Sequence, residues 1–127
     1  MIAVDTFALM AILLGDREAD ACSTALTTAE RLLISSGTVA EALIVARRRN
    51  VAEQMHALIY LFGAEIVSVT SASARRVAAA YERWGKGVHP AGLNFGDCFA
   101  YDVAKEHDCK LLYVGEDFAK TDVLAVL

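Results

Sequence analysis

The chain has 127 residues, a length typical of one folded domain that buries a core without disulfides or a structural metal. Apolar residues make up 56% of the sequence and proline occurs once, which excludes a disordered chain or a proline-rich linker. The formal net charge of -4 argues against a protein that binds nucleic acid through a surplus of lysine and arginine, so a polyanionic substrate would need positive charge from another source.

Short apolar runs alternate along the chain with longer runs of helical propensity. In chain order, the sequence predicts a strand over 2–4, helices over 7–14 and 17–30, a strand over 32–34, helices over 38–49 and 51–62, a strand over 65–69, a helix over 71–84, a loop over 85–92, a helix over 95–107 and a strand over 110–114. We expect Thr38 to cap the third helix and Ser71 or Ser73 to cap the fifth. Because such alternation implies crossover connections, the sequence predicts an α/β fold of three layers, α/β/α, with a central parallel sheet.

Two acidic residues in the first half of the chain have a structural interpretation beside a functional one. Asp5 directly follows the first strand among apolar residues, so it does not belong to a solvated face, and either Asp5 or Thr6 can cap the next helix. Glu41 completes the spacing Thr38-x-x-Glu41 of a capping box, in which the acid reaches back to the helix start. Neither residue is decisive alone.

Two further acids in the second half of the chain have the same ambiguity. Asp97 stands three residues after Asn94, at a helix start where the helix dipole favours an acid. Asp117 follows the last strand and Gly115, where an aspartate in a turn is ordinary. Each of the two is compatible with a purely structural role.

The joint placement of the four acids favours a site. All four lie at helix starts or strand ends, which gather at the carboxyl edge of an open parallel sheet, where ligands bind. Carboxylates crowded together repel each other and raise one another's pKa values unless a cation lies between them. Oxygen ligands without histidine or cysteine select Mg²⁺ or Mn²⁺ over zinc, and such an ion can orient a water for attack on a phosphodiester. The ion would also supply the positive charge that the composition lacks.

Three segments of the chain resemble one known family. They are the segment Gly92-Leu93-Asn94-Phe95-Gly96-Asp97-Cys98-Phe99-Ala100-Tyr101, the N-terminal Val4-Asp5-Thr6, and the closing segment Gly115-Glu116-Asp117-Phe118-x-x-Thr121-Asp122. Together they resemble the VapC toxins of the PIN-domain family, and the resemblance spans essentially the whole chain, which suggests a single PIN domain over 1–127. The family's metal-binding acids map onto Asp5, Glu41, Asp97 and Asp117.

The resemblance implies a magnesium-dependent endoribonuclease, usually a homodimer, that is neutralised by a VapB-type antitoxin protein. It also implies supporting roles, such as orienting the metal ligands or water, for a second group of residues. These are Thr6, Asn94, Glu116, Thr121 and Asp122. Glu116 is an additional acid that could replace or assist Asp117, and Asp102 stands where the family commonly has an apolar residue.

Lys86 and His89 are the candidates for contact with RNA phosphates, because they lie in the glycine-rich loop that leads to the acidic motif. The run Arg47-Arg48-Arg49 ends a predicted helix, where cations complement the helix dipole, and this solvated role competes with an RNA contact. Tyr81 and Trp84 lie three residues apart on one helix and are more typical of a core or interface than of a base-stacking surface.

Two other classes of protein remain as alternatives. A phosphoacceptor receiver module also binds magnesium at a sheet edge, but it needs adjacent acids after the first strand and a lysine after the last, whereas Asp5 stands alone and Lys110 precedes the last strand. A non-catalytic binding domain would use the acids only as caps. The odd number of cysteines, three, without a Cys-x-x-Cys pair, together with a short N-terminal apolar stretch, leads us to expect a cytoplasmic protein without a membrane span.

Overall fold

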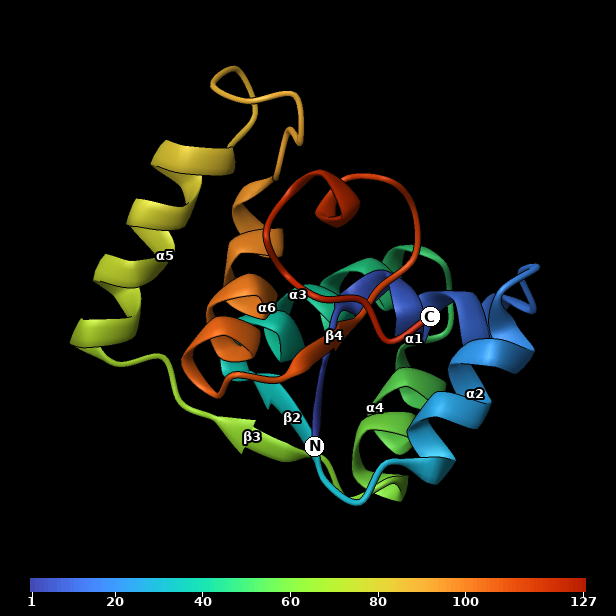
Figure 1. The fold of residues 1–127 in the computed structure, drawn as a ribbon. Helices are drawn as coiled ribbons and strands as arrows, with labels where there is room; N and C mark the ends of the chain where they lie inside the picture. The colour runs from blue at the N-terminus through green and yellow to red at the C-terminus, as the bar shows by residue number, and fades with distance from the viewer.

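The structure is a computed structural model that describes residues 1–127, and it contains a parallel sheet between two groups of helices (Figure 1). Its elements in chain order are β1 (Ile2–Val4), α1 (Thr6–Leu14), α2 (Ala19–Thr28), β2 (Leu32–Ser35), α3 (Ser36–Arg48), α4 (Ala52–Leu61), β3 (Glu65–Val67), α5 (Ser71–Trp84), α6 (Phe95–Glu106), β4 (Lys110–Leu112) and the short 3₁₀ helix η1 (Phe118–Lys120). The predicted α/β class and three-layer arrangement are confirmed. No helix is both long enough and apolar enough to cross a membrane.

The four strands are parallel and pair in the order β3-β2-β1-β4. The first strand therefore lies inside the sheet, with Ile2 opposite both Leu32 of β2 and Lys110 of β4. Because all strands run in one direction, their carboxyl ends meet at one edge, which is the upper edge in Figure 1. The segments that follow β1, β2 and β4 start at that edge.

Alternate residues of the strands enter two separate cores, one on each face of the sheet. Ala3, Leu33 and Leu111 pack with α5, α6 and the C-terminal segment. Val4 and Leu112, their neighbours in the chain, pack on the opposite face with α1 to α4. This period of two is what a strand buried on both sides requires, and it accounts for the continuous apolar runs in the sequence.

The structure corrects the predicted caps of two helices and the start of one of them. Helix α3 begins at Ser36 with Ser35 as its cap, because the Ser35 hydroxyl accepts a hydrogen bond from the backbone N–H of Gly37 at 3.1 Å. The predicted cap at Thr38 is wrong, and Thr38 instead lies buried inside the helix. Helix α5 is capped by Thr70, whose hydroxyl accepts from the N–H of Ser73, so the predicted caps one and three residues later are also wrong.

The other element boundaries either coincide with the predictions or differ by one or two residues. The largest differences are two residues: α2 is shorter than predicted at both ends (Ala19–Thr28), and β3 and β4 end early, at Val67 and Leu112. After β3, the N–H of Val69 turns away from the sheet to donate to the hydroxyl of Ser36 at 3.1 Å. After β4, the chain leaves the sheet, and the C-terminal segment with η1, red in Figure 1, lies above its carboxyl edge.

Candidate active site

The four predicted site acids come from four different elements and meet at the carboxyl edge of the sheet. Asp5 follows β1, Glu41 lies in α3, Asp97 lies in the first turn of α6, and Asp117 follows β4. Besides burial, the charges of Asp97 and Glu41 raise the pKa of Asp5. The charges of Glu41 and Asp117 likewise raise the pKa of Asp97. The fold therefore brings the four carboxylates into one electrostatic group, which we call the acidic cluster.

Asp5 is the most deeply buried member of the acidic cluster, with 1% of its surface exposed. Its Oδ2 accepts a hydrogen bond from the N–H of Phe7 at 3.2 Å and caps α1, so the capping interpretation is correct for this oxygen. Its Oδ1 is buried without any hydrogen-bond partner. Burial first, and then the charge of Asp97, raise the pKa of Asp5 to about 8, although the hydrogen bond from Phe7 opposes the shift. Oδ2 of Asp5 therefore caps α1, and Oδ1 is left without a hydrogen-bond partner.

Glu41 is held in the acidic cluster by neighbours on two other helices. Its Oε1 accepts a 2.6 Å hydrogen bond from the Thr6 hydroxyl, which supports the predicted orienting role of Thr6. The capping-box interpretation is wrong for Glu41, because α3 starts earlier and Ser35 caps it. A side chain at Gly96 would collide with the Glu41 carboxylate, so glycine at this position lets that carboxylate lie directly against α6.

Asp97 combines a cap with a buried acid. Its Oδ2 accepts a 2.8 Å hydrogen bond from the N–H of Asn94, the residue that precedes α6. Burial first, and then the charges of Glu41 and Asp117, raise the pKa of Asp97 to about 6 against the effect of that hydrogen bond. Asn94 therefore acts on the cluster through its backbone, which agrees with the supporting position predicted for it.

Asp117 and Glu116 are both exposed. Asp117 precedes η1 without capping it through its side chain, so its carboxylate is free to bind a ligand. The charge of Glu116 acts on Tyr113 instead, because burial and this charge together raise the pKa of that tyrosine. Of the two acids, Asp117 is the one that interacts with Asp97.

Thr121 and Asp122 do not contact the acidic cluster directly. The Thr121 hydroxyl donates to the carbonyl of Phe118 at 2.7 Å and accepts from the N–H of Val123 at 3.2 Å, which fixes the turn after η1. Asp122 accepts a 2.6 Å hydrogen bond from the hydroxyl of Tyr101. These contacts support the segment that carries Asp117 and give no direct contact with a bound ion.

The predicted RNA-contact residues lie in the loop between α5 and α6, on the same side of the molecule as the carboxyl ends of the strands (Figure 1). Lys86 is exposed. The ring of His89 packs edge-on against Trp84, 4.7 Å between centroids, and its Nδ1 accepts from the N–H of Ala91 at 3.0 Å. His89 therefore shapes the loop, and Lys86 is the freer of the two to reach a phosphate.

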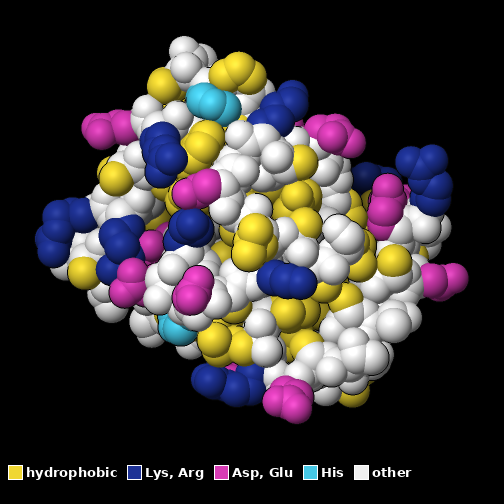
Figure 2. Space-filling model, viewed as in Figure 1, with side chains coloured by type: hydrophobic (Ala, Val, Ile, Leu, Met, Phe, Trp, Pro, Cys, Tyr) yellow, Lys and Arg dark blue, Asp and Glu magenta, His cyan; other side chains and the backbone are white.

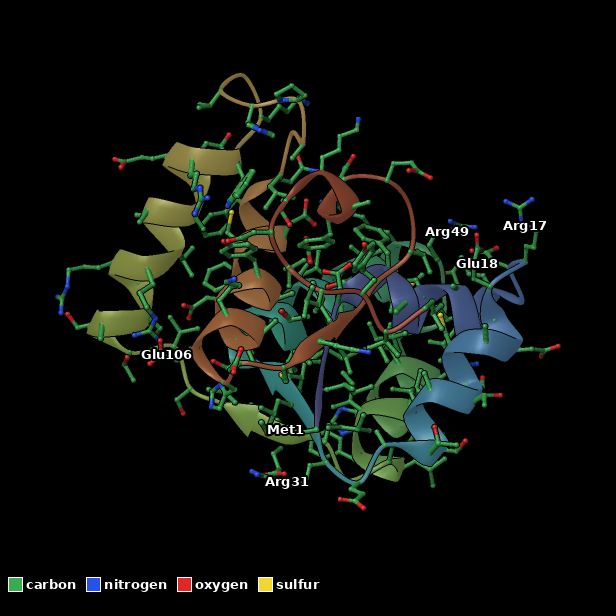
Figure 3. All side chains as sticks on the ribbon, in the orientation of Figure 1. Met1, Arg17, Glu18, Arg31, Arg49 and Glu106 are labelled. Atoms are coloured by element: carbon green, nitrogen blue, oxygen red, sulfur yellow. The ribbon has the colours of Figure 1, made fainter.

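Basic side chains are distributed over the surface without a large area of one sign. Figure 2 shows lysine and arginine interspersed with acids and apolar side chains over one face. Arg49, at the end of α3, is exposed and lies at the periphery of the view in Figure 3. The surface thus agrees with the argument from composition that bulk positive charge does not carry nucleic-acid binding in this chain.

The acidic cluster fits a hard divalent cation by its chemistry, although its side chains do not form a finished cage. No three Asp, Glu, His or Cys side chains are close enough together to hold a metal ion. Oxygens of Glu41 and Asp97 are engaged by Thr6 and Asn94 instead. The buried Oδ1 of Asp5 nevertheless lacks any partner, and every available donor is an oxygen, the ligand that Mg²⁺ and Mn²⁺ prefer.

Sequence reasoning missed three residues that shape this region. Gly96 was part of the recognised segment, but its contact with Glu41 depends on how two helices cross. Gly37 allows the ring of Phe99 to approach α3 in the same way. Tyr101 carries the hydrogen bond to Asp122, and its position four residues after Asp97 on a helix was the signal that could have found it.

The sequence matches the family model of the PIN domain over residues 2–124. It is also 34% identical over 126 residues to ribonuclease VapC30 of Mycobacterium tuberculosis, covering 97% of this chain and 96% of that protein. The chain belongs to the VapC toxin ribonucleases of the PIN-domain family. The receiver-module alternative is thereby wrong.

Two other relatives agree with this family, and two solved structures share the fold. Ribonuclease VapC36 of M. tuberculosis is 39% identical over 127 residues, covering 94% of this chain and 89% of that protein, and ribonuclease VapC of Mycolicibacterium smegmatis is 36% identical over 126 residues, covering 97% and 98%. The fold of VapC20 of M. tuberculosis, described as a Sarcin-Ricin loop cleaving toxin, superposes with a TM-score of 0.79 at 19% identity, covering 99% of this chain and 98% of that one. A toxin–antitoxin complex from Klebsiella pneumoniae gives a TM-score of 0.73 at 19% identity, covering 99% and 97%.

Proposed function

We propose that this VapC-family chain is a divalent-metal-dependent endoribonuclease in which Asp5, Glu41, Asp97 and Asp117 hold Mg²⁺ or Mn²⁺. The observation that carries the proposal is the carboxylate of Asp5, which is buried with one oxygen unpartnered beside a second buried acid. A cation is the one partner that offsets both the burial of these charges and their mutual repulsion. When bound, the ion would neutralise the scissile phosphate and lower the pKa of an attacking water.

Other residues of the chain would orient the metal-binding carboxylates and contact the RNA. Thr6 holds Glu41 by its 2.6 Å hydrogen bond, and Asn94 holds one oxygen of Asp97 by its backbone N–H. These contacts leave the second oxygen of each carboxylate free, as they leave Oδ1 of Asp5. Lys86, in the exposed loop beside α6, would neutralise a phosphate flanking the cleaved bond.

We also propose that the chain is the toxin of a toxin–antitoxin pair, covered by a VapB-type antitoxin and active as a homodimer in the cytoplasm. Apolar side chains around the acidic cluster support a protein partner, because Phe7 of α1, Ile44 of α3 and Phe95 of α6 are 42%, 55% and 69% exposed. Helix α3 packs against both α1 and α6, so the three side chains come from adjoining helices. A partner that covers them would also block the site.

The test is to map RNA cleavage ends after brief expression of the parent chain and of Asp97→Asn, and to repeat the cleavage with purified protein in Mg²⁺, Mn²⁺ or EDTA. We expect defined cleavage products and slowed growth from the parent, metal dependence in the purified reaction, and neither effect from the variant. High expression of the parent without a partner, with normal growth and intact RNA, would contradict the proposed function and favour the non-catalytic alternative.

A further inference from the structure

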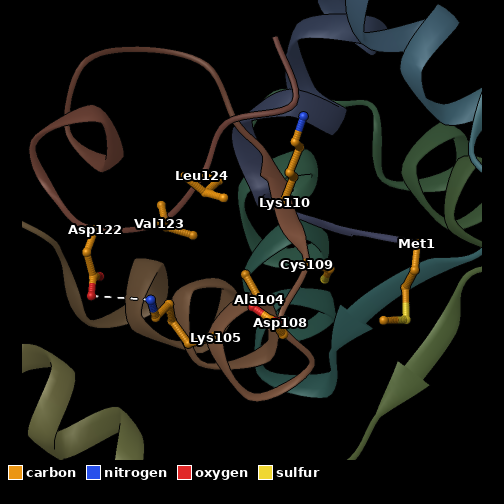
Figure 4. Close-up of a pocket in the computed structure, with 9 residues that line it drawn as sticks. All are labelled: Met1, Ala104, Lys105, Asp108, Cys109, Lys110, Asp122, Val123 and Leu124. Atoms are coloured by element: carbon orange, nitrogen blue, oxygen red, sulfur yellow. Dashed lines mark ion pairs between the residues drawn. The ribbon is translucent and has the colours of Figure 1, made fainter.

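One face of α6 connects the acidic cluster to the C-terminal segment. Asp97, Tyr101 and Lys105 are spaced four residues apart, so they lie along one side of the helix. The Tyr101 hydroxyl donates a 2.6 Å hydrogen bond to Oδ1 of Asp122, and Lys105 Nζ lies 3.2 Å from the other oxygen, Oδ2. Figure 4 shows the ion pair between Lys105 and Asp122 beside the pocket that they line with β4.

The chain between Asp117 and Asp122 forms one closed turn. The N–H of Lys120 donates to the carbonyl of Asp117 at 3.2 Å, and both the N–H and the hydroxyl of Thr121 donate to the carbonyl of Phe118. Phe118 is buried and packs its ring on Tyr113 with 5.2 Å between centroids. The segment that links Asp122 to Asp117 is therefore short and internally hydrogen-bonded.

Asp122 is the residue through which polar side-chain contacts join residues 113–123 to α6, by the hydrogen bond from Tyr101 and the ion pair with Lys105. The backbone bonds that return the chain to the sheet come later, where Leu111 pairs with Leu124 and Val126. Asp117 itself is exposed and does not cap η1 through its side chain. Its place relative to α6 therefore depends on how the segment is held, by Phe118 and Val123 in the core and by Asp122 on α6.

We propose that Tyr101 and Asp122 are positioning residues that hold Asp117 at the correct separation from Asp97. Helix α6 carries Asp97 in its first turn and, through Tyr101, also holds the segment that carries Asp117. The inference rests on the proposed function, because it assigns the pair to the geometry of the metal site. Asp97 is fixed in the first turn of α6, and Asp122 is fixed to the same helix one and two turns later. The segment 117–122 spans the distance between them.

The electrostatics of the pair agree with this role. Partial burial by itself raises the pKa of Asp122, but the hydrogen bond from Tyr101 and the charges of Lys105 and Arg83 outweigh it and lower that pKa. Asp122 is thus ionised at neutral pH, and an O–H donor to an ionised carboxylate makes a strong hydrogen bond. Tyr101 is itself held by Trp84, whose Nε1–H donates to the same hydroxyl at 3.0 Å.

The test compares Tyr101→Phe with Tyr113→Phe, which removes a hydroxyl from the tyrosine whose contact with Phe118 is made by its ring. Amide hydrogen exchange of residues 116–123 is measured without metal or RNA, and Mn²⁺ binding is measured by calorimetry. For Tyr101→Phe we expect about tenfold faster exchange in that segment, the scale on which a hydrogen bond to a charged group acts. Mn²⁺ affinity should fall by about tenfold, the lower range for residues that support metal ligands. Tyr113→Phe should leave both unchanged.

A second pair of variants tests the same hydrogen bond from its other side, so the test does not depend on whether Tyr101→Phe folds. Asp122→Ala should reproduce both effects, because the exposed position tolerates alanine, whereas Asp122→Asn should restore exchange and Mn²⁺ affinity, because its amide oxygen still accepts from Tyr101. Unchanged exchange in Asp122→Ala would overturn the proposal, and so would faster exchange with unaltered Mn²⁺ binding, which would show a structural role only. A parent that binds no Mn²⁺ and cleaves no RNA would defeat the proposed function and with it the positioning role, while the exchange data would still establish whether the pair anchors the segment.

Discussion

Helix α6 carries two buried aspartates, Asp97 and Asp102, and only Asp102 is paired with a basic side chain. Asp102 faces α5, where its two oxygens accept hydrogen bonds from the Arg76 guanidinium at 2.7 and 3.3 Å. Arg76 is also 3.4 Å from Glu106, which lies at the lower end of α6 in Figure 3. Asp97, five residues earlier, is equally buried but faces three other acids and has no cation within the chain.

The comparison separates a structural acid from a functional one. A buried carboxylate that is paired with arginine can be explained by the packing of two helices. A buried carboxylate among other carboxylates costs the fold stability unless a cation binds from outside, and strongly shifted pKa values of this kind concentrate at functional sites. The chain keeps both kinds on one helix, so exchanging the two acids for amides tests the distinction directly.

The largest expected effect is on RNA cleavage. Asp97→Asn should lower the rate of metal-dependent cleavage by at least about a hundredfold, beyond the range that residues supporting a metal ligand usually show. Asp102→Asn, at equal burial on the same helix, should retain cleavage within about threefold of the parent. Single-turnover cleavage of one defined RNA by both variants measures the difference. Equal loss in both would show that the site needs the intact helix and not this particular carboxylate.

The next effect is on folding stability, where Asp102→Asn should be the more damaging of the two variants. Asp102→Asn should lower the free energy of unfolding by about 1–2 kcal/mol, less than for a fully buried pair because Arg76 is 40% exposed and stays solvated. In EDTA, Asp97→Asn should be as stable as the parent or more so, because it removes repulsion and keeps an oxygen for the N–H of Asn94. Urea unfolding of the two variants gives both values. A clear loss of stability in Asp97→Asn without metal would contradict the repulsion argument.

A third effect is the dependence of stability on pH without metal. The pKa values of Asp5 and Asp97 are raised to about 8 and about 6 in the folded state, so between pH 4 and 8 the folded chain holds more protons than the unfolded chain. Stability contributed by these groups is therefore lost as pH rises through that window, by up to about 1.4 kcal/mol per pH unit for each extra proton retained. Melting temperatures in EDTA should fall from pH 5 to 8, and Asp5→Asn should flatten the decline. A rising curve in this range would mean that the two acids are not in a crowded site.

The smallest effect on stability is expected at Gly96. In Gly96→Ala the added methyl group would meet the carboxylate of Glu41, a flexible side chain that can move away. We therefore expect a change in unfolding free energy within about 0.5 kcal/mol, the range of ordinary surface substitutions. Cleavage should still fall by about tenfold because Glu41 leaves the cluster. Cleavage at the parent rate would show that the place of Glu41 in the cluster is unimportant.

The alternation of strands and helices and the meeting of the four acids at one edge were predictable from the sequence. Both follow from local patterns, since strand ends in a parallel sheet share an edge whatever the details of packing. The cap of α3 was not predictable, because Ser35, Ser36 and Thr38 all suit that role and tertiary packing selects the first of them. The site assignments themselves remain predictions until the variants are made.

The contacts that connect the site to the rest of the fold were also beyond the sequence. The approach of Gly96 to Glu41 depends on the crossing of α3 and α6, and the hydrogen bond from Tyr101 to Asp122 depends on the path of an irregular segment. The partner of Asp102 lies 26 residues away on α5, so the local pattern did not show that this acid is paired with a cation. Long-range packing decides which buried acid receives a cation from the chain and which is left without one.

The most direct test of the claim that the acidic cluster binds a divalent cation is thermal unfolding at pH 8 in EDTA and in excess Mg²⁺, for the parent and for Asp5→Asn. Metal that binds only the folded parent should stabilise it by about 2.7 kcal/mol at a hundredfold excess over Kd, which raises its melting temperature by several degrees. Asp5→Asn should melt higher than the parent in EDTA, because asparagine still caps α1 without a buried charge, and it should gain much less from Mg²⁺. A parent that Mg²⁺ does not stabilise, or a variant that gains as much as the parent, would contradict the account.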